Sequence, residues 1–504
     1  MKIERTKNAK AGILTGALNR LVNLGLPFIT RTVLLYVLGT EYLGLSGLFS
    51  SLLSFLALAE LGVSNALVYS MYKPIAVGDK DTLCALLALY RKLYRLIGTF
   101  ILTAGLICVP FLPMLINGHV PADINLYALY GLYLANTVCS YFLFAYRGSL
   151  LHAHQRTDVD NLINSVIPTI SWILQMGALL IFRSYYAYVI FLPIATIVTN
   201  FVRLYYSEKF FPQYKPRGKV DPELEASIFK KIKALLGAKI STTVLHSSDN
   251  LVISAFLGLS MVTIYGNYYY IMNAVGGFLG IVYSAILPGI GNSLVTETLD
   301  KNYRDFKKFT FLNQWLVGWC AVCLLCLYQP FIGLWAGESL VLPFSVVILI
   351  VIYFVFYEGR KVVITYKDAA GLWWEDRFRP FVMAGTNLIS NLILVQLIGV
   401  WGIVLSTILS LLVSIPWETH TVFKHVFKRS PKEYVLSLVQ FLLVVTIACI
   451  ITLGVCQIFS EGILAILIRG CICVVVPNVI FFLAFRKREE FADAKVLLLR
   501  VLKR

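Results

Sequence analysis

The sequence predicts an all-α polytopic membrane protein with about 14 transmembrane helices. The chain has 504 residues, of which 58% are hydrophobic, and its mean hydropathy is +0.77. Its apolar runs reach ~20 residues or more, the length that a helix needs to cross ~30 Å of hydrocarbon. In addition, 39 of the 44 Lys and Arg residues fall in alternate gaps between these runs.

The apolar runs define the expected helices in chain order. They cover residues 11–39, 43–71, 96–116, 124–146, 161–182, 185–206, 234–257, 262–295, 309–333, 340–359, 380–398, 401–423, 434–458 and 462–485. Every second gap is basic, whereas the gaps between them are short and hold one basic residue, Arg183. The positive-inside rule therefore predicts that both termini are cytoplasmic.

The gaps also predict a division of the chain. We expect an N-terminal lobe of six spans, a cytoplasmic inter-lobe linker, a C-terminal lobe of six spans, two extra spans and a basic amphipathic cytoplasmic tail. These parts cover residues 1–206, 207–233, 234–424, 425–485 and 486–504. RTVLLYVLG at 31–39 is similar to NLVISAFLG at 250–258, and each run closes the first helix of one lobe. An even number of spans between repeats predicts parallel halves.

Several classes of function are disfavoured. The outer gaps are too short for a catalytic domain, and no phosphate-binding loop, nucleotide motif or metal-ligand spacing is recognisable, so we expect no enzyme and no bound metal. The net charge of +17 is spread over juxtamembrane loops, which suits anionic lipid headgroups rather than nucleic acid. Cys320, Cys323 and Cys326 share one helix side and are expected to pack in the core.

Charged residues inside apolar runs indicate a functional site, since each costs ~2.5 to 3.5 kcal/mol at the membrane centre. In the first run, Arg20, Asn23 and Arg31 share a helix face with Gly16 and Pro27. Arg20 and Arg31 lie roughly 16 Å apart along the axis. We expect this face to line a water-filled cavity or to form buried ion pairs.

The seventh run repeats the pattern with Lys239, Thr242, His246, Asp249 and Asn250. Lys239 extends the predicted cationic cavity or reaches the inner surface. Asp249 either pairs with a cation of another helix or takes part in ion coupling, and His246 either joins a proton relay or packs through hydrogen bonds.

Glu60 of the second run is expected either to pair with a cation, with Arg20 or Arg31 as the candidate partner, or to carry a proton. Weaker polar faces hold Asn161, Asn164 and Gln175 in one run and Asn387 and Asn391 in another. Such amides line cavities or join helices. Arg183 and Arg469 are expected to reach the outer surface or pack against neighbours.

Two stretches carry a family resemblance. Residues 31–76 (RTVLLYVLGTEYLGLSGLFSSLLSFLALAELGVSNALVYSMYKPIA) and 249–266 (DNLVISAFLGLSMVTIYG) resemble bacterial polysaccharide-repeat exporters of the Wzx type. These belong to the multidrug/oligosaccharidyl-lipid/polysaccharide (MOP) superfamily. The resemblance implies two six-helix lobes around a central cavity, two extra C-terminal helices, and flipping of an undecaprenyl-pyrophosphate-linked oligosaccharide across the bacterial cytoplasmic membrane.

The residue chemistry suits such a substrate. Arginine offers a fixed fork of donors to a pyrophosphate. The membrane potential, H⁺ or Na⁺ could supply the driving force, with Asp249 and Glu60 as the coupling residues, and no other cofactor is expected. The expected partners are the lipid-linked oligosaccharide, membrane lipids and polysaccharide polymerase machinery, around a monomeric transporter. The alternatives are a lipid II flippase, a cation-coupled drug antiporter and, from another class, a membrane polysaccharide polymerase or ligase.

Overall fold

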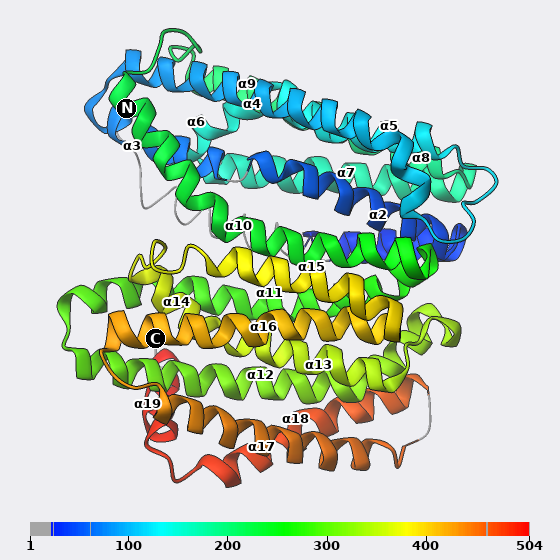
Figure 1. Ribbon diagram of the computed structural model, residues 1–504, viewed down its shortest axis with the longest axis vertical. Helices are drawn as coiled ribbons and strands as arrows, with labels where there is room; N and C mark the ends of the chain where they lie inside the picture. The colour runs from blue at the N-terminus through cyan, green and yellow to red at the C-terminus, as the bar shows by residue number, and fades with distance from the viewer. Residues whose placement is uncertain (1–21, 24, 61, 460–461, 503–504) are drawn as a thin grey trace. The chain divides into compact units, whose positions relative to one another are not determined.

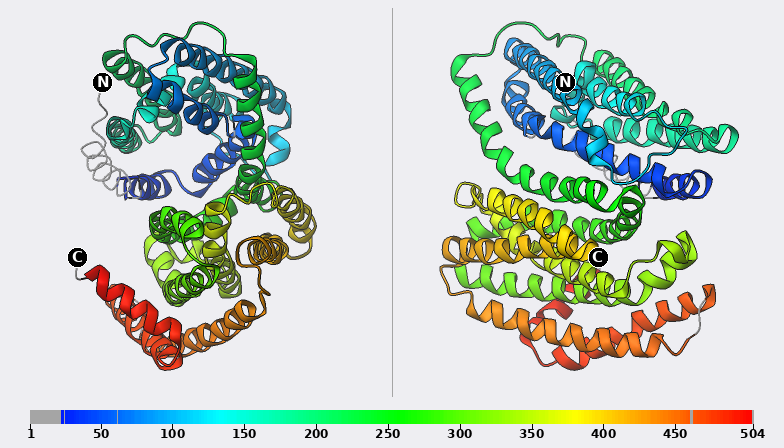
Figure 2. Two further views of the ribbon diagram at one scale, coloured as in Figure 1. Left: turned by 90° about the vertical axis from the view of Figure 1, so that its left-hand side faces the viewer. Right: turned by 45° about the vertical axis from the view of Figure 1, so that its right-hand side comes forward.

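The computed structural model describes residues 22–23, 25–60, 62–459 and 462–502, which form helices, turns and loops with no β-strand among them (Figure 1). By packing, the chain divides into an N-terminal unit, Met1–Thr263, and a C-terminal unit, Ile264–Arg504. Within each unit most long helices run side by side, and the left view of Figure 2 looks nearly along them.

The N-terminal unit begins with a short apolar helix, Gly25–Val37. The helices that follow are α2 (Thr40–Leu56), the 3₁₀ turn η1 (Ala57–Glu60), α3 (Val63–Val77), α4 (Lys80–Cys108), η2 (Val109–Leu115), α5 (Leu126–Phe142), η3 (Phe144–Arg147), α6 (Gly148–Ala153), α7 (Thr157–Phe182), α8 (Tyr185–Val189), α9 (Phe191–Phe210) and α10 (Pro222–Leu257). Helix α10 packs on α2 and α3, and α9 packs on α5 and α7.

Helix α11 (Leu259–Thr296) starts at the end of the N-terminal unit and continues into the C-terminal unit. The helices after it are α12 (Leu299–Ala336), η4 (Glu338–Leu340), α13 (Phe344–Gly359), α14 (Lys361–Ala369), α15 (Arg379–Ile398), α16 (Val400–Val422), the π-helical turn η5 (Phe423–Phe427), α17 (Lys432–Cys456), α18 (Ile463–Phe485) and α19 (Glu489–Leu502). Helices α15 and α16 form a hairpin, and α12 packs on α13, α17, α18 and α19.

Most predicted spans coincide with helices, except that the span 43–71 is interrupted between α2 and α3 and that α10 begins at Pro222, within the predicted linker. Among the described residues, nine helices are long and apolar enough to cross a membrane, and the pair Leu126–Phe142 and Phe144–Ala153, bent by 43°, makes a tenth if it counts as one span. The protein is therefore a multispanning helical membrane protein, while the number of fourteen spans stays a prediction. The predicted lobe boundaries also stay a prediction, since the packing division at Thr263 groups α10 with the preceding helices.

Polar side chains begin several helices. Asp79, Asn125, Asp221 and Thr298 accept hydrogen bonds from backbone N–H groups in the first turns of α4, α5, α10 and α12. These contacts satisfy amides that a helix start leaves without an intrahelical partner. They explain why the chain begins these helices directly after its loops.

Aromatic residues organise the cores. In the N-terminal unit, the Phe49 ring lies 5.5 Å from the rings of both Tyr130 and Tyr133. In the C-terminal unit, Phe306 of α12 is fully buried among aromatic rings of α14, η5 and α17. Cys326 also lies in the core, as predicted, and its sulfur atom is within 4.8 Å of those of Cys456 and Cys473.

The two similar runs, 31–39 and 250–258, end in the same backbone conformation. Gly39 has φ +107° and ψ −176°, and Gly258 has φ +89° and ψ 171°. Residues that have a side chain rarely adopt a backbone conformation with positive φ, so glycine permits each tight turn. The next helix begins one residue later in both cases, at Thr40 and at Leu259.

Candidate functional site

Arg31 is half-buried in the first described helix, and its guanidinium contacts another helix of the N-terminal unit. Its Nη2 donates a 3.3 Å hydrogen bond to the carbonyl oxygen of Thr263, in the first turns of α11. The Thr263 hydroxyl in turn donates to the carbonyl of Thr40 over 2.6 Å. A cation inside an apolar helix thus makes polar contact with protein, as the cost of exposing it to lipid requires.

The structure does not describe the side chains of the other cations that were predicted to line the cavity. Arg20 lies outside the described residues. Lys239 and His246 lie on the backbone of α10, but their side chains are also outside the described set. Asn23 is exposed. The predicted cationic cavity therefore stays a prediction.

Glu60 lies at a break within the second predicted span. Regular α2 ends at Leu56, a 3₁₀ turn runs to Glu60, and α3 starts at Val63 after Gly62, whose φ is +94°. A positive φ suits glycine and turns the chain where a continuous helix would otherwise pass. The break places a carboxylate between two half-helices, an arrangement that membrane transporters use to bind ions.

A chain of hydroxyl groups leads to this carboxylate. The Tyr94 hydroxyl donates to Oε1 of Glu60 over 3.0 Å, and the Tyr90 hydroxyl donates to that of Tyr94 over 3.2 Å. Both tyrosines lie one turn apart on α4 and are buried. The arrangement gives Glu60 a defined protein partner and can pass a proton along the hydroxyl groups.

Asp249 and Asn250 occupy the later part of α10. The Asp249 side chain is buried, and the Asn250 amide donates to the Ser51 hydroxyl of α2 over 2.9 Å. Asn250 therefore joins two helices of the N-terminal unit. Whether Asp249 and Glu60 couple transport to an ion stays a prediction.

The described contacts of the polar face of α7 join this helix to its neighbours. Asp160 accepts from Arg203 of α9 and from Asn164, at 3.0 and 2.8 Å, and Arg203 also donates to Asn164 over 3.0 Å. The Gln175 amide is buried and donates to the carbonyl of Tyr188 over 3.4 Å. These contacts favour the interpretation that Asn164 and Gln175 join helices. Asn161 is half-buried on the same helix, and its predicted cavity role stays a prediction.

The amides of α15 face α16 within the same hairpin. Asn387 and Asn391 are fully buried. The Asn387 amide donates to the Thr407 hydroxyl over 3.2 Å, and the Ser406 hydroxyl donates to Asn391. The result is a connected layer of amides and hydroxyls between two apolar helices.

The C-terminal unit also contains a buried ion network that sequence reasoning missed. One carboxylate oxygen of Glu418 in α16 forms ion pairs with Arg360 and Arg379, at 2.7 and 2.5 Å. Asp376 binds Arg379 and Lys367, each at 2.8 Å. All five side chains are at most 8% exposed.

This network holds three cations, at the end of α13, within α14 and at the start of α15, and two buried carboxylates. A third carboxylate, Asp368, lies 3.7 Å from Lys367. Counting basic residues by gap assigns Arg360, Lys367 and Arg379 to a cytoplasmic loop, where they would be solvated. The missed signal is Glu418, a carboxylate inside the apolar run 401–423. A buried carboxylate requires cationic partners.

The remaining predicted positions agree with expectation where they are described. Arg183 is exposed at the end of α7, with φ +47°. The Arg469 guanidinium donates to the carbonyl of Phe459 over 2.9 Å, beyond the end of α17. Both cations lie near helix ends and thus need no role in transport.

Known structures share this fold. A lipid II flippase, MurJ, in an inward closed conformation is 15% identical with a TM-score of 0.69, covering 94% of this chain and 98% of its own. A MATE transporter of Vibrio cholerae is 13% identical, with a TM-score of 0.56 and coverage of 84% and 99%. A MOP-superfamily transporter of Pyrococcus furiosus is 14% identical, with a TM-score of 0.52 and coverage of 84% and 96%. No curated protein matches the sequence.

The fold is thus that of MOP-superfamily flippases and transporters, as the sequence resemblance implied. Residues 9–294, more than half of the chain, match the family described as "Polysaccharide biosynthesis protein". That region includes Arg31, the break at Glu60 and the polar positions of α7 and α10. On this evidence, the chain belongs to the polysaccharide biosynthesis protein family.

Proposed function

We propose that this protein flips an undecaprenyl-pyrophosphate-linked oligosaccharide repeat unit from the inner to the outer leaflet of the bacterial cytoplasmic membrane by alternating access. The product would serve the synthesis of O-antigen, capsule or exopolysaccharide. The family match over residues 9–294 carries the proposal. The fold, which resembles that of a lipid II flippase, supports it.

In this proposal Arg31 binds the pyrophosphate. Its guanidinium is half-buried and directed toward the carbonyl of Thr263, so it is held on protein rather than in lipid. A guanidinium can form paired hydrogen bonds to phosphate oxygens as the anion leaves water. Arg20, three turns earlier on the same predicted face, would act in the same way.

The inside-negative potential would favour outward movement of an anion by ~2.3 kcal/mol per charge per 100 mV. A substrate with about two charges would therefore gain ~4 to 5 kcal/mol without a coupled ion. If a proton is also used, Glu60 is the preferred coupling residue, because a chain of two tyrosine hydroxyls reaches its carboxylate.

The proposal is tested in the native host after deletion of the gene, by complementation with Arg20→Ala and Arg31→Ala. Each variant should strongly reduce surface polysaccharide while its amount in the membrane stays normal. Arg183→Ala, which removes an exposed cation at a helix end, is the matched control and should restore the polymer. Normal polymer from both cavity variants would contradict the proposal.

A lipid II flippase is the second candidate, favoured by the similarity to MurJ over 94% of the chain. Both lipids contain a pyrophosphate, so the cationic residues do not separate them. Expression in cells depleted of their lipid II flippase separates the two. Rescue of cell-wall synthesis without any effect on surface polysaccharide would favour this second function.

A further inference from the structure

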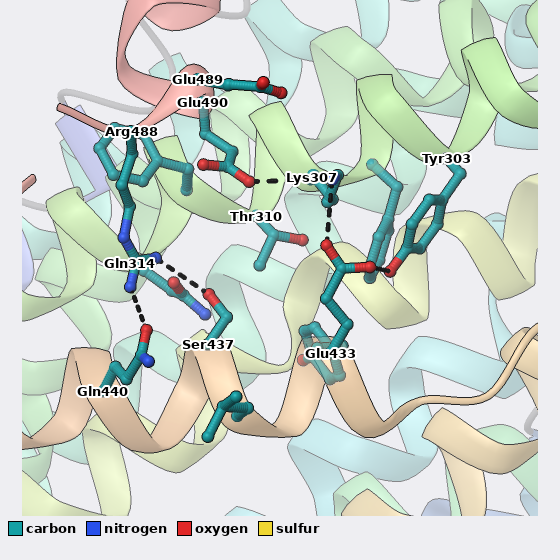
Figure 3. A pocket seen from close by; sticks show the side chains of 14 residues that line it. Tyr303, Lys307, Thr310, Gln314, Glu433, Ser437, Gln440, Arg488, Glu489 and Glu490 are labelled. Atoms are coloured by element: carbon teal, nitrogen blue, oxygen red, sulfur yellow. Dashed lines mark hydrogen bonds and ion pairs between the residues drawn. The ribbon is translucent and has the colours of Figure 1, made fainter.

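A polar pocket lies in the C-terminal unit between α12, α17 and the start of α19 (Figure 3). Its volume is about 400 Å³. The pocket is located where apolar segments end, since α17 begins at Lys432 and α18 ends at Phe485. The pocket is therefore at the expected level of the lipid headgroups.

Two buried polar side chains in this pocket lack partners. Thr310 and Gln314 lie one turn apart on α12 and are 5% and 3% exposed. The Thr310 hydroxyl and the Gln314 amide nitrogen have no hydrogen-bond partner among the described residues. Both line the pocket. Because buried polar groups are normally satisfied, these two indicate a ligand with hydrogen-bonding groups.

The charges in the pocket have both signs. The Arg488 guanidinium points into it and donates to the hydroxyl of Ser437 over 3.3 Å and to the amide oxygen of Gln440, two neutral groups (Figure 3). Lys307 lies 3.1 Å from Glu433 and 4.0 Å from Glu490.

Glu489 also lines the pocket and is exposed. Two cations thus face three carboxylates. This balance disfavours a ligand that has only negative charge, such as a pyrophosphate, and favours one that has both an anion and a cation.

An apolar slot adjoins the polar pocket. The slot, of about 140 Å³, is lined by side chains of α12, α13, α16 and α17, and it shares Gln314 and Tyr434 with the polar pocket. Apart from Arg360, its lining residues are uncharged and most are aliphatic or aromatic. A polar pocket beside an apolar slot fits an amphiphile with a compact headgroup.

We propose that this pocket holds the phosphoethanolamine headgroup of a membrane phospholipid. The phosphate binds the Arg488 guanidinium and the Gln314 amide, and the ammonium group binds Glu489 and Glu490. One acyl chain starts in the apolar slot. This lipid is a bound component rather than the transported substrate, so the inference goes beyond the proposed function.

The test uses the full-length protein in nanodiscs that contain equal amounts of phosphatidylethanolamine, phosphatidylcholine and phosphatidylglycerol. Lipid that stays bound after transfer to detergent is measured by native mass spectrometry. We expect phosphatidylethanolamine to exceed each other lipid about tenfold, which corresponds to ~1.4 kcal/mol. Phosphatidylcholine has the same phosphate and the same positive charge but no N–H donor, so it isolates the contribution of the ammonium hydrogen bonds to the carboxylates.

Variants locate the binding site. Arg488→Gln should lower bound phosphatidylethanolamine about tenfold through loss of a charge-assisted contact. Glu489→Gln, at an exposed side chain, should lower the preference over phosphatidylcholine without affecting folding. Arg486→Gln, an exposed neighbour outside the pocket, is the control and should leave retention unchanged. Gel filtration confirms that each variant is folded.

Three results would overturn the inference. The first is equal retention of the three lipids by the unaltered protein. The second is unchanged retention in both Arg488→Gln and Glu489→Gln. The third is preferential binding of added undecaprenyl pyrophosphate in their place, which would assign the pocket to the substrate. Soluble glycerophosphoethanolamine should not displace the lipid, and displacement would contradict the placement of an acyl chain in the apolar slot. Surface polysaccharide in the Arg31→Ala strain is an independent readout, so failure of either proposal is recognised separately.

Discussion

The Tyr94 hydroxyl donates a 3.0 Å hydrogen bond to Oε1 of Glu60, at the point where regular helix between α2 and α3 is interrupted. The contact joins α4 to the broken span. It gives a carboxylate within the second predicted span a defined partner, and it connects that carboxylate to the neighbouring Tyr90.

Tyr94→Phe tests how much the hydrogen bond between Tyr94 and Glu60 stabilises the protein. The variant keeps the buried ring but leaves Glu60 without one hydrogen bond, so we expect a loss of stability of ~2 kcal/mol. Thermal unfolding of the purified protein in detergent measures the loss. Tyr69→Phe removes an exposed hydroxyl and is the matched control. Equal melting temperatures for the two variants would contradict the expectation.

Glu60→Gln tests whether Glu60 couples transport to the movement of protons. The amide cannot release a proton, so we expect transport into vesicles to continue without any response to an imposed pH gradient. Asp249→Asn is examined in the same assay and should retain the response of the unaltered protein. Loss of the response in Asp249→Asn alone would transfer the coupling role to that residue.

Glu418→Gln should strongly destabilise the C-terminal unit. Arg360 and Arg379 share one oxygen of Glu418, and Arg379 also pairs with Asp376. The substitution therefore removes the ion pair of the buried Arg360 and one of the two pairs of Arg379, at a cost of ~3 to 5 kcal/mol. Glu297→Gln removes an exposed pair with Lys301 and should cost less than ~1 kcal/mol. Chemical denaturation followed by Trp fluorescence compares them, and similar midpoints would be inconsistent with a structural role for the network.

Gly402→Ala tests the close packing of the α15–α16 hairpin. A Cβ atom at Gly402 would lie 2.3 Å from the carbonyl oxygen of Leu394, so a backbone must shift, with a loss of stability of ~1 to 3 kcal/mol. Gly385→Ala on the same hairpin meets nothing within 4 Å and should be neutral or stabilising. Melting temperatures of the two variants in detergent give the comparison. A neutral Gly402→Ala would show that the helices can separate there.

The attachment of α19 should depend on pH. The Nε and Nη2 groups of Arg304 each donate to Asp493 over 2.8 Å, and this hydrogen bonding holds the pKa of the Asp493 carboxyl below its usual value. A lowered pKa in the folded protein stabilises attachment above the unfolded pKa of about 4, and the stabilisation is lost as the pH falls through the folded value.

Hydrogen exchange in α19 between pH 7 and pH 3 measures this effect. We expect protection to be constant down to about pH 4 and to fall below it. Asp493→Asn should lower protection at neutral pH and remove the additional loss in acid. Unchanged protection in that variant would show that apolar contacts alone hold the helix.

Much of the fold was predictable because hydropathy dictates it. A segment such as 434–458 has no alternative to a helix in lipid, and the structure has α17 at 432–456. The tail was likewise predicted as amphipathic and forms α19. The interruption at Glu60 was not predicted, although a carboxylate followed within two residues by glycine in an apolar run was the available signal.

The site was less predictable. Arg360 and Arg379 lie between two apolar runs, and a count of basic residues in such segments assigns them to an ordinary cytoplasmic loop. The count contains no information on partners that are distant in the sequence. Their carboxylate, Glu418, is 58 residues from Arg360 and meets it only when α13 and α16 pack together. Conversely, Asn387 and Asn391 were recognisable as polar positions, but only the structure shows that both face α16.

The interruption between α2 and α3 also has a mechanical meaning. An intact helix resists bending because each turn is tied to the next by backbone hydrogen bonds, whereas a short 3₁₀ turn followed by a glycine with φ of +94° has no such stiffness. The second span therefore consists of two helices with different neighbours, since α2 packs mainly on α10 whereas α3 packs mainly on α4 and α6. Glu60 lies at that junction, so a change in its protonation would alter the charge between two helices that no continuous run of backbone hydrogen bonds ties together.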